Sequence, residues 1–217
     1  MIVAPSILTA PREKMLSEGQ ALFKAGAKWI HLDIMDGKFV PNTSFDEEVV
    51  EDFRDHFPAP FRDVHLMVVD VAHAIPSYIE AGAESVTFHY EALNDEKEID
   101  GLIEYCHSHN VKIGMSISPD TKVEVLKPFL PKFDMFLIMS VHPGKGGQSF
   151  LPSALDKIAY LAKAKKDNGY NYLIEVDGGI NETTAPLVKK AGVEVLVAGS
   201  YLIDKEDREA RVAGLLA

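Results

Sequence analysis

The stretch WIHLDIMDG at residues 29–37 decides the fold and carries the first candidate functional residues. Its apolar residues at every second position predict a β-strand, in which alternate side chains share a face. His31, Asp33 and Met35 therefore lie on one face, and three aliphatic side chains lie on the other. A histidine, a carboxylate and a thioether pack poorly together in a core unless they bind something. Partner residues are therefore expected in the other predicted strands.

Short apolar runs alternate with amphipathic, helix-like stretches along the whole chain. This alternation predicts parallel strands joined by crossover helices, with a glycine ending several of the helices. Eight such units in one domain spanning residues 1–217 predict an α/β fold of the (β/α)8 TIM-barrel type. An open doubly wound sheet is the alternative, but it usually has a glycine-rich fingerprint after its first strand, where this chain has SILTA at residues 6–10. The predicted strands are Ile2–Ile7, Trp29–Met35, Arg62–Val68, Ser85–Tyr90, Lys112–Ile117, Met135–Val141, Tyr172–Asp177 and Val195–Ser200, and the helix-ending glycines are Gly26, Gly82, Gly169 and Gly192.

The composition excludes several classes of partner. The formal net charge of −11 argues against binding to nucleic acid or to an anionic membrane. The single cysteine, Cys106, excludes an intrachain disulfide and a cysteine-rich zinc module. No apolar run is long enough to cross a membrane, and the N-terminus lacks the basic region of a signal peptide. We therefore expect a cytoplasmic protein.

Polar residues collect where the predicted strands end, which is where TIM-barrel active sites lie. His31 and Asp33 lie late in the second strand, His65 lies in the third and Asp177 ends the seventh. His-x-Asp alone is a weak signal, because most buried histidines are only hydrogen-bonded. Two histidines and two carboxylates converging at one place predict a site for one divalent metal ion, with Zn²⁺, Fe²⁺, Mn²⁺ or Co²⁺ favoured over Ca²⁺ or Mg²⁺.

Other histidines are interpreted as ordinary residues without a matching carboxylate. They lie in predicted helices, in loops or in a strand, and the interpretation applies to His56, His73, His89, His107 and His109.

Glycine-rich loops follow the last three predicted strands. Three glycines occur within four residues of the loop at 141–148, and loops after the seventh and eighth strands are the usual phosphate site of such barrels. Backbone N–H groups in glycine-rich loops can approach an anion closely. Glycines also serve simply to make tight turns, but three such loops after successive strands favour a phosphate site. The predicted phosphate-binding residues are Gly144, Gly146, Gly147, Gly178, Gly179, Gly199 and Ser200, whereas Lys145 is interpreted as a solvent-facing loop residue.

Taken together, these motifs resemble the ribulose-phosphate 3-epimerase family over nearly the whole chain. The resemblance rests on APSIL at residues 4–8, HLDIMDG at 31–37, FVPN at 39–42, DVHLMV at 63–68, PG and GGQ at 143–148, VDGGI at 176–180 and VAGS at 197–200. It implies an isomerase of the pentose phosphate pathway that interconverts D-ribulose 5-phosphate and D-xylulose 5-phosphate, and it implies a homo-oligomer. The metal ligands that it implies are His31, Asp33, His65 and Asp177. The resemblance also implies that Ser6, Met35, Met67 and Met139 bind substrate. From the pattern alone, the three methionines could instead be core packing. His65 and Asp177 are expected to contact substrate as well.

The reaction requires two acid/base groups, because a proton leaves one face of C3 and another arrives at the opposite face. Asp33 and Asp177 are the expected pair, since the second and seventh strands are three steps apart around the barrel. A metal ion would stabilise the enediolate that forms between the two proton transfers.

Departures from the family pattern leave the substrate open. Lys145 replaces an aromatic residue, His142 precedes Pro143, and the segments at 43–47 and 116–120 differ. An epimerase for a six-carbon ketose phosphate such as allulose 6-phosphate is therefore an alternative, and a non-catalytic phosphosugar-binding sensor is another. A decarboxylase or an aldolase is disfavoured, because those chemistries usually need a lysine at a strand end and no predicted strand ends with one.

Overall fold

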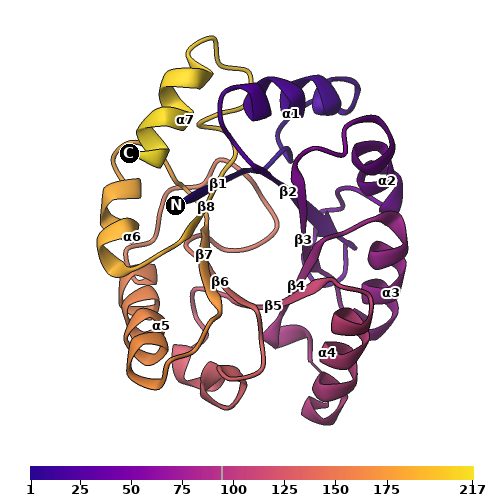
Figure 1. Cartoon of the computed structure of the whole chain (residues 1–217), viewed down its shortest axis with the longest axis vertical. Coiled ribbons are helices and arrows are strands. Elements are labelled where there is room, and N and C mark those ends of the chain that lie inside the picture. Colours follow the sequence, from indigo (N-terminus) through magenta and orange to yellow (C-terminus); the bar gives the residue numbers. More distant parts are fainter. Residues whose placement is uncertain (94) are drawn as a thin grey trace.

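The computed structural model describes residues 1–93 and 95–217 and contains a barrel of eight parallel strands surrounded by helices (Figure 1). The strands are connected in the order β1-β8-β7-β6-β5-β4-β3-β2, so that β1 and β2 come together to close the ring. The predicted TIM-barrel fold is therefore confirmed. The strands are β1 (Ile2–Pro5), β2 (Trp29–Met35), β3 (Phe61–Met67), β4 (Ser85–His89), β5 (Lys112–Ile117), β6 (Met135–Met139), β7 (Leu173–Asp177) and β8 (Val195–Ala198).

Helices connect successive strands and cover the outside of the barrel. One connection differs from the expected pattern, because β5 and β6 are joined by a 3-10 helix at Val123–Phe129 rather than by an α-helix. Pro128 lies inside this segment and lacks the N–H that an α-helix would use. The α-helices are α1 (Met15–Lys24), α2 (Glu47–His56), α3 (Val71–Ala81), α4 (Ile99–Ser108), α5 (Ala154–Asn168), α6 (Ala185–Ala191) and α7 (Arg208–Leu216).

Glycines end helices where the sequence predicts them. Gly82, Gly169 and Gly192 follow α3, α5 and α6 with φ values of 112°, 69° and 112°, which are left-handed conformations that glycine adopts without strain. Each residue reverses the chain from the outer helix toward the next strand of the barrel.

The alternation within β2 separates the core from the site. Ile30, Leu32 and Ile34 are buried in the apolar layer beneath the helices, whereas His31 and Asp33 are buried on the opposite face. The predicted two-faced strand is therefore correct, and its polar face points into the barrel.

The carboxyl ends of the strands form one opening of the barrel, the barrel mouth, and the ring of strands closes near it between β1 and β2. β1 and β2 meet through a single bridge between Ser6 and His31, and the Ile7 N–H lies 3.4 Å from the His31 carbonyl oxygen. The predicted first strand is longer than β1, because beyond Pro5 the chain turns into the mouth. Among the described residues, none of the helices combines the length and apolar character needed to cross a bilayer.

Candidate active site

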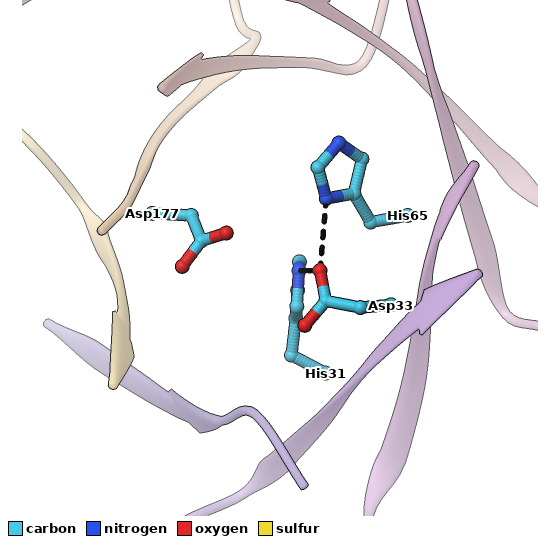
Figure 2. A group of neighbouring side chains, drawn as sticks. All are labelled: His31, Asp33, His65 and Asp177. Atoms are coloured by element: carbon cyan, nitrogen blue, oxygen red, sulfur yellow. Dashed lines mark hydrogen bonds and ion pairs between the residues drawn. The ribbon is translucent and has the colours of Figure 1, made fainter. Parts of the chain in front are cut away.

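Four predicted residues meet at the barrel mouth (Figure 2). His31 and Asp33 come from β2, His65 comes from β3 and Asp177 comes from the end of β7. One potential ligand atom from each lies within 4.8 Å of the others. Figure 2 shows Asp177 approaching from the side opposite the other three. Two imidazoles and two carboxylates at this spacing can hold one divalent cation.

Asp33 lies at the centre of the hydrogen bonds in this group. The Ser6 hydroxyl donates to Asp33 Oδ2 at 2.6 Å, and His65 Nδ1 lies 3.1 Å from Asp33 Oδ1. His31 Nε2 lies 3.4 Å from the same Oδ1 and is buried without a hydrogen-bond partner in the part of the chain that the structure describes. A buried imidazole nitrogen without a partner, aimed at a carboxylate, fits a metal-binding role.

The register of β2 and β3 brings these groups together. Asp33 lies opposite His65, and His31 lies opposite Asp63. Asp63 Oδ2 lies 2.7 Å from His31 Nδ1, and the Ser85 hydroxyl donates to Asp63 Oδ1 at 2.5 Å. A carboxylate that accepts from one ring nitrogen leaves the other nitrogen free for a metal ion. Asp63 is not among the predicted site residues, although it lies two residues before His65 and therefore shares its face.

Glu175 is a second buried carboxyl group that the sequence analysis missed. It lies two residues before Asp177, and neither of its oxygens has a hydrogen-bond partner among the described side chains and backbone. Burial, reinforced by the charge of Asp63, raises the pKa of Glu175 well above its ordinary value. The same two-residue alternation that selects His31 and Asp33 would have placed Glu175 inside the barrel.

The two aspartates of the mouth have opposite pKa shifts. Burial raises the pKa of Asp177 to about 7, and the charge of Asp33 adds to the effect. Burial acts in the same direction on Asp33, but the nearby charge of His31 outweighs it and lowers the pKa of Asp33. Without a metal ion, Asp33 is therefore ionised near neutral pH, whereas a large fraction of Asp177 still carries a proton, an arrangement typical of acid/base pairs.

The two histidines differ as well. Burial lowers the pKa of His65 to about 4, so its imidazole is neutral at physiological pH. Burial disfavours the charge on His31 too, but Asp33 and Asp63 reverse this effect and raise its pKa well above the ordinary value. A metal ion at this site would replace the His31 proton.

A cavity of about 360 Å³ opens above this group. Asp33 and Asp177 reach its wall, whereas His31 and His65 do not. The predicted direct contact between His65 and substrate therefore lacks structural support, because its imidazole lies behind Asp33 and next to His89. The remaining predicted substrate residues all line the cavity, namely Ser6, Met35, Met67, Met139, Gly144, Gly146, Gly147, Gly178, Gly179, Gly199 and Ser200.

The loops after β6, β7 and β8 form one end of the cavity. Gly178 and Gly179 have φ values of 124° and 64°, and the Ser140 hydroxyl donates to the carbonyl oxygens of Asp177 and Gly178. Lys145 is exposed at the rim. Lys205 and Arg211 also line the cavity and were not predicted, because no motif marks the C-terminal segment as part of the site.

His89 corrects one sequence-based interpretation. This histidine ends β4, is completely buried and has a matching carboxylate, since its Nδ1 lies 3.1 Å from Glu91 Oε2. His107 also has a carboxylate partner, Asp134 at 2.8 Å, but this pair is partly exposed and lies outside the barrel mouth. Residue spacing within a strand did not reveal these two carboxylate partners, because they depend on chain geometry.

The structure is thus a TIM barrel with buried titratable groups and a candidate metal site at the carboxyl ends of its strands. The chain belongs to the Ribulose-phosphate 3 epimerase family, whose sequence profile matches residues 2–203. It is thereby an isomerase that acts on carbohydrates, as the sequence predicted.

Relatives support this placement along the full chain. A ribulose-phosphate 3-epimerase of Chlamydia pneumoniae is 40% identical over 208 residues, covering 95% of this chain and 89% of that protein. The protein of the same name from Bacillus subtilis is 39% identical over 212 residues, covering 97% and 96%. The crystal structure of 3-keto-L-gulonate-6-phosphate decarboxylase from Vibrio cholerae has a TM-score of 0.73 over 100% of this chain and 95% of that one. Its identity of 15% shows a shared fold alone.

Proposed function

We propose that this protein interconverts D-ribulose 5-phosphate and D-xylulose 5-phosphate by proton transfer at C3, with one divalent metal ion as cofactor. The observation that carries the proposal is the placement of Asp33 and Asp177 on opposite sides of one cavity, with opposite pKa shifts. Epimerisation needs a base on one face of the substrate and an acid on the other. The names of the relatives support the choice of substrate.

In the proposed mechanism, the ionised Asp33 removes the C3 proton, and the electron pair moves onto the C2 oxygen to give an enediolate. Asp177, which carries a proton at this stage of the proposed cycle, then donates it to the opposite face of C3. The result is an inverted carbon, a protonated Asp33 and an ionised Asp177. The reverse reaction starts from this state, and exchange with solvent restores the original one.

The residues for the metal ion are His31, Asp33, His65 and Asp177. When bound, a divalent cation supplies positive charge that lowers the energy of the enediolate. The unpartnered Nε2 of His31 and the orienting carboxylate of Asp63 support this assignment. The choice among Zn²⁺, Fe²⁺, Mn²⁺ and Co²⁺ is left to metal analysis of the purified protein.

The glycine loops are proposed to hold the substrate phosphate through backbone N–H groups, as glycine-rich turns do for other anions. Anchoring the phosphate fixes the position of C3 between the two aspartates, and such positioning lowers the barrier. Met35, Met67 and Met139 line the cavity as apolar, polarizable walls that limit access of water to the intermediate. The proposal includes the cytoplasmic location and homo-oligomeric state that the sequence analysis expects.

Proton exchange tests the proposal directly. Metal-loaded protein in D₂O should incorporate deuterium at C3 of ribulose 5-phosphate and form xylulose 5-phosphate, as followed by proton NMR. Replacing either aspartate of the pair by asparagine should lower kcat by about 10²–10⁴-fold, the usual contribution of an acid/base group. Glu104→Gln, which alters an exposed carboxylate of α4, is the matched control and should leave kcat unchanged.

Other outcomes would replace parts of the proposal. Exchange that occurs only with a six-carbon ketose phosphate would keep the mechanism and change the substrate. Binding of both sugar phosphates without any exchange would favour the sensor. Full activity in protein that elemental analysis shows to be free of metal would exclude the cofactor.

A further inference from the structure

His89 contacts His65 edge to edge on the side away from the cavity. Their Nε2 atoms are 2.9 Å apart, the ring centroids are 5.0 Å apart and the ring planes differ by 28°. Both side chains are completely buried. Two neighbouring imidazole nitrogens at this distance form a hydrogen bond only if one donates a proton and the other accepts it.

Glu91 determines which nitrogen of His89 carries the proton. Glu91 Oε1 accepts from the Ser118 N–H at 2.8 Å and from the Thr121 hydroxyl, while Oε2 faces His89 Nδ1 at 3.1 Å. These three hydrogen bonds outweigh partial burial and lower the pKa of Glu91 to about 2. Glu91 is therefore an acceptor at both oxygens, and His89 Nδ1 donates to it.

The protonated nitrogen of His89 in turn determines which nitrogen of His65 can donate. Because His89 donates from Nδ1 to Glu91, its Nε2 is available to accept a hydrogen bond from Nε2 of His65. The lone pair of His65 is then on Nδ1, which faces Asp33 Oδ1 at 3.1 Å. Two acceptors that face each other at this distance repel unless a cation lies between them.

We propose that Glu91 and His89 are positioning residues that hold His65 in the tautomer whose Nδ1 lone pair faces the metal site. The inference rests on the proposed function, since it concerns the same metal site. His31 is oriented in the opposite sense, because Asp63 accepts from its Nδ1 and leaves Nε2 free. Each histidine of the site thus has its own acceptor on the neighbouring strand, Asp63 of β3 for His31 and His89 of β4 for His65.

The substitution Glu91→Gln tests the order of donors and acceptors in the hydrogen bonds from Glu91 through His89 to His65. The oxygen at Oε1 is retained, because it must still accept from Ser118 and Thr121, so the amide NH₂ takes the place of Oε2. That NH₂ donates to His89 Nδ1, His89 then donates from Nε2, and His65 is left with a proton on Nδ1. We expect Glu91→Gln to weaken Zn²⁺ binding to the full-length protein by about 10–100-fold, the usual effect of losing an orienting partner.

Thr121→Val is the matched control. It removes one contact between Glu91 and the loop after β5, but it leaves the Glu91–His89 contact in place. We expect its Zn²⁺ affinity, measured by isothermal titration calorimetry, to equal that of the wild type.

Nitrogen-15 NMR of the histidines adds a readout that a merely structural role would not change. With and without Zn²⁺, the His89 Nδ1 resonance should be pyrrole-type in the wild type and in Thr121→Val, and pyridine-type in Glu91→Gln. Equal Zn²⁺ affinity in Glu91→Gln and the control, or an unchanged His89 Nδ1 resonance, would overturn the inference and leave the proposed function standing. A wild-type protein that does not bind Zn²⁺ would count against both.

Discussion

Asp177→Asn should have opposite effects on turnover and on the stability of the metal-free protein. Burial and the neighbouring Asp33 raise the pKa of Asp177 from 3.8 to about 7. The folded state therefore binds this proton more tightly than the unfolded chain does. Because deprotonation is then disfavoured in the fold, the contribution of Asp177 to the free energy of unfolding falls as pH rises from about 4 to 7.

The size of this effect follows from the two pKa values. A pKa of about 7 in the fold against 3.8 in the unfolded chain corresponds to about 4 kcal/mol above pH 7. Asp177 is partly exposed at the cavity wall, so water screens its charge, and we expect a smaller effect of about 2 kcal/mol on the free energy of unfolding. An asparagine does not ionise, and the variant should therefore be more stable than the wild type by this amount at pH 8 and equally stable at pH 4.

Equilibrium urea unfolding in the presence of a chelator, followed from pH 4 to pH 8, measures this difference. The stability gain should accompany a loss of C3 exchange in the metal-loaded variant. Glu104→Gln, at an exposed position on α4, should show neither effect. A difference between wild type and Asp177→Asn that does not change with pH would refute the assignment of a protonated Asp177.

Two further results are expected. Metal affinity should rise by about tenfold per unit increase in pH for each proton released, because the raised pKa of His31 means that a proton must leave its ring before a cation binds. Calorimetry in two buffers of different ionisation enthalpy counts the released protons. Metal binding without proton release would contradict this expectation. Gly179→Ala should lower the free energy of unfolding by about 2 kcal/mol or more and raise KM, because its φ is 64° and an added Cβ would lie 2.6 Å from the backbone N of Phe150. Gly147→Ala is the matched control for stability, since the φ of Gly147 is a similar 73° but no described neighbouring atom lies within 4 Å of the added Cβ. Equal losses in the free energy of unfolding in both variants would contradict the steric explanation.

Strand β2 shows how much of the site can be predicted from the sequence alone. Alternation is a local property of an extended chain, so the sequence of β2 was enough to place His31 and Asp33 on one face and Ile30 and Leu32 on the other. The same rule applied to β3 and β7 would have added Asp63 and Glu175. The alternation that places these two carboxyl groups inside the barrel is therefore present in the sequence.

Contacts between strands required the tertiary structure. The Asp33–His65 and His31–Asp63 pairs depend on the register of β2 and β3, which no single strand encodes. The end of β1 at Pro5, followed by the bridge from Ser6 to His31, is likewise a feature of how β1 meets β2. The 3-10 segment between β5 and β6 instead has a local cause, because Pro128 lies inside it.

The number of strands, the polar face of β2 and the glycine loops after the last three strands could be predicted from the sequence alone. These features follow from residue type and spacing along the chain, which fix the local conformation. Only the tertiary structure revealed that His89 connects His65 to Glu91 and that Lys205 and Arg211 reach the cavity. These residues come from segments whose relative positions are set by barrel closure and helix packing, and the tautomer of a buried histidine depends on the groups that such packing brings next to it.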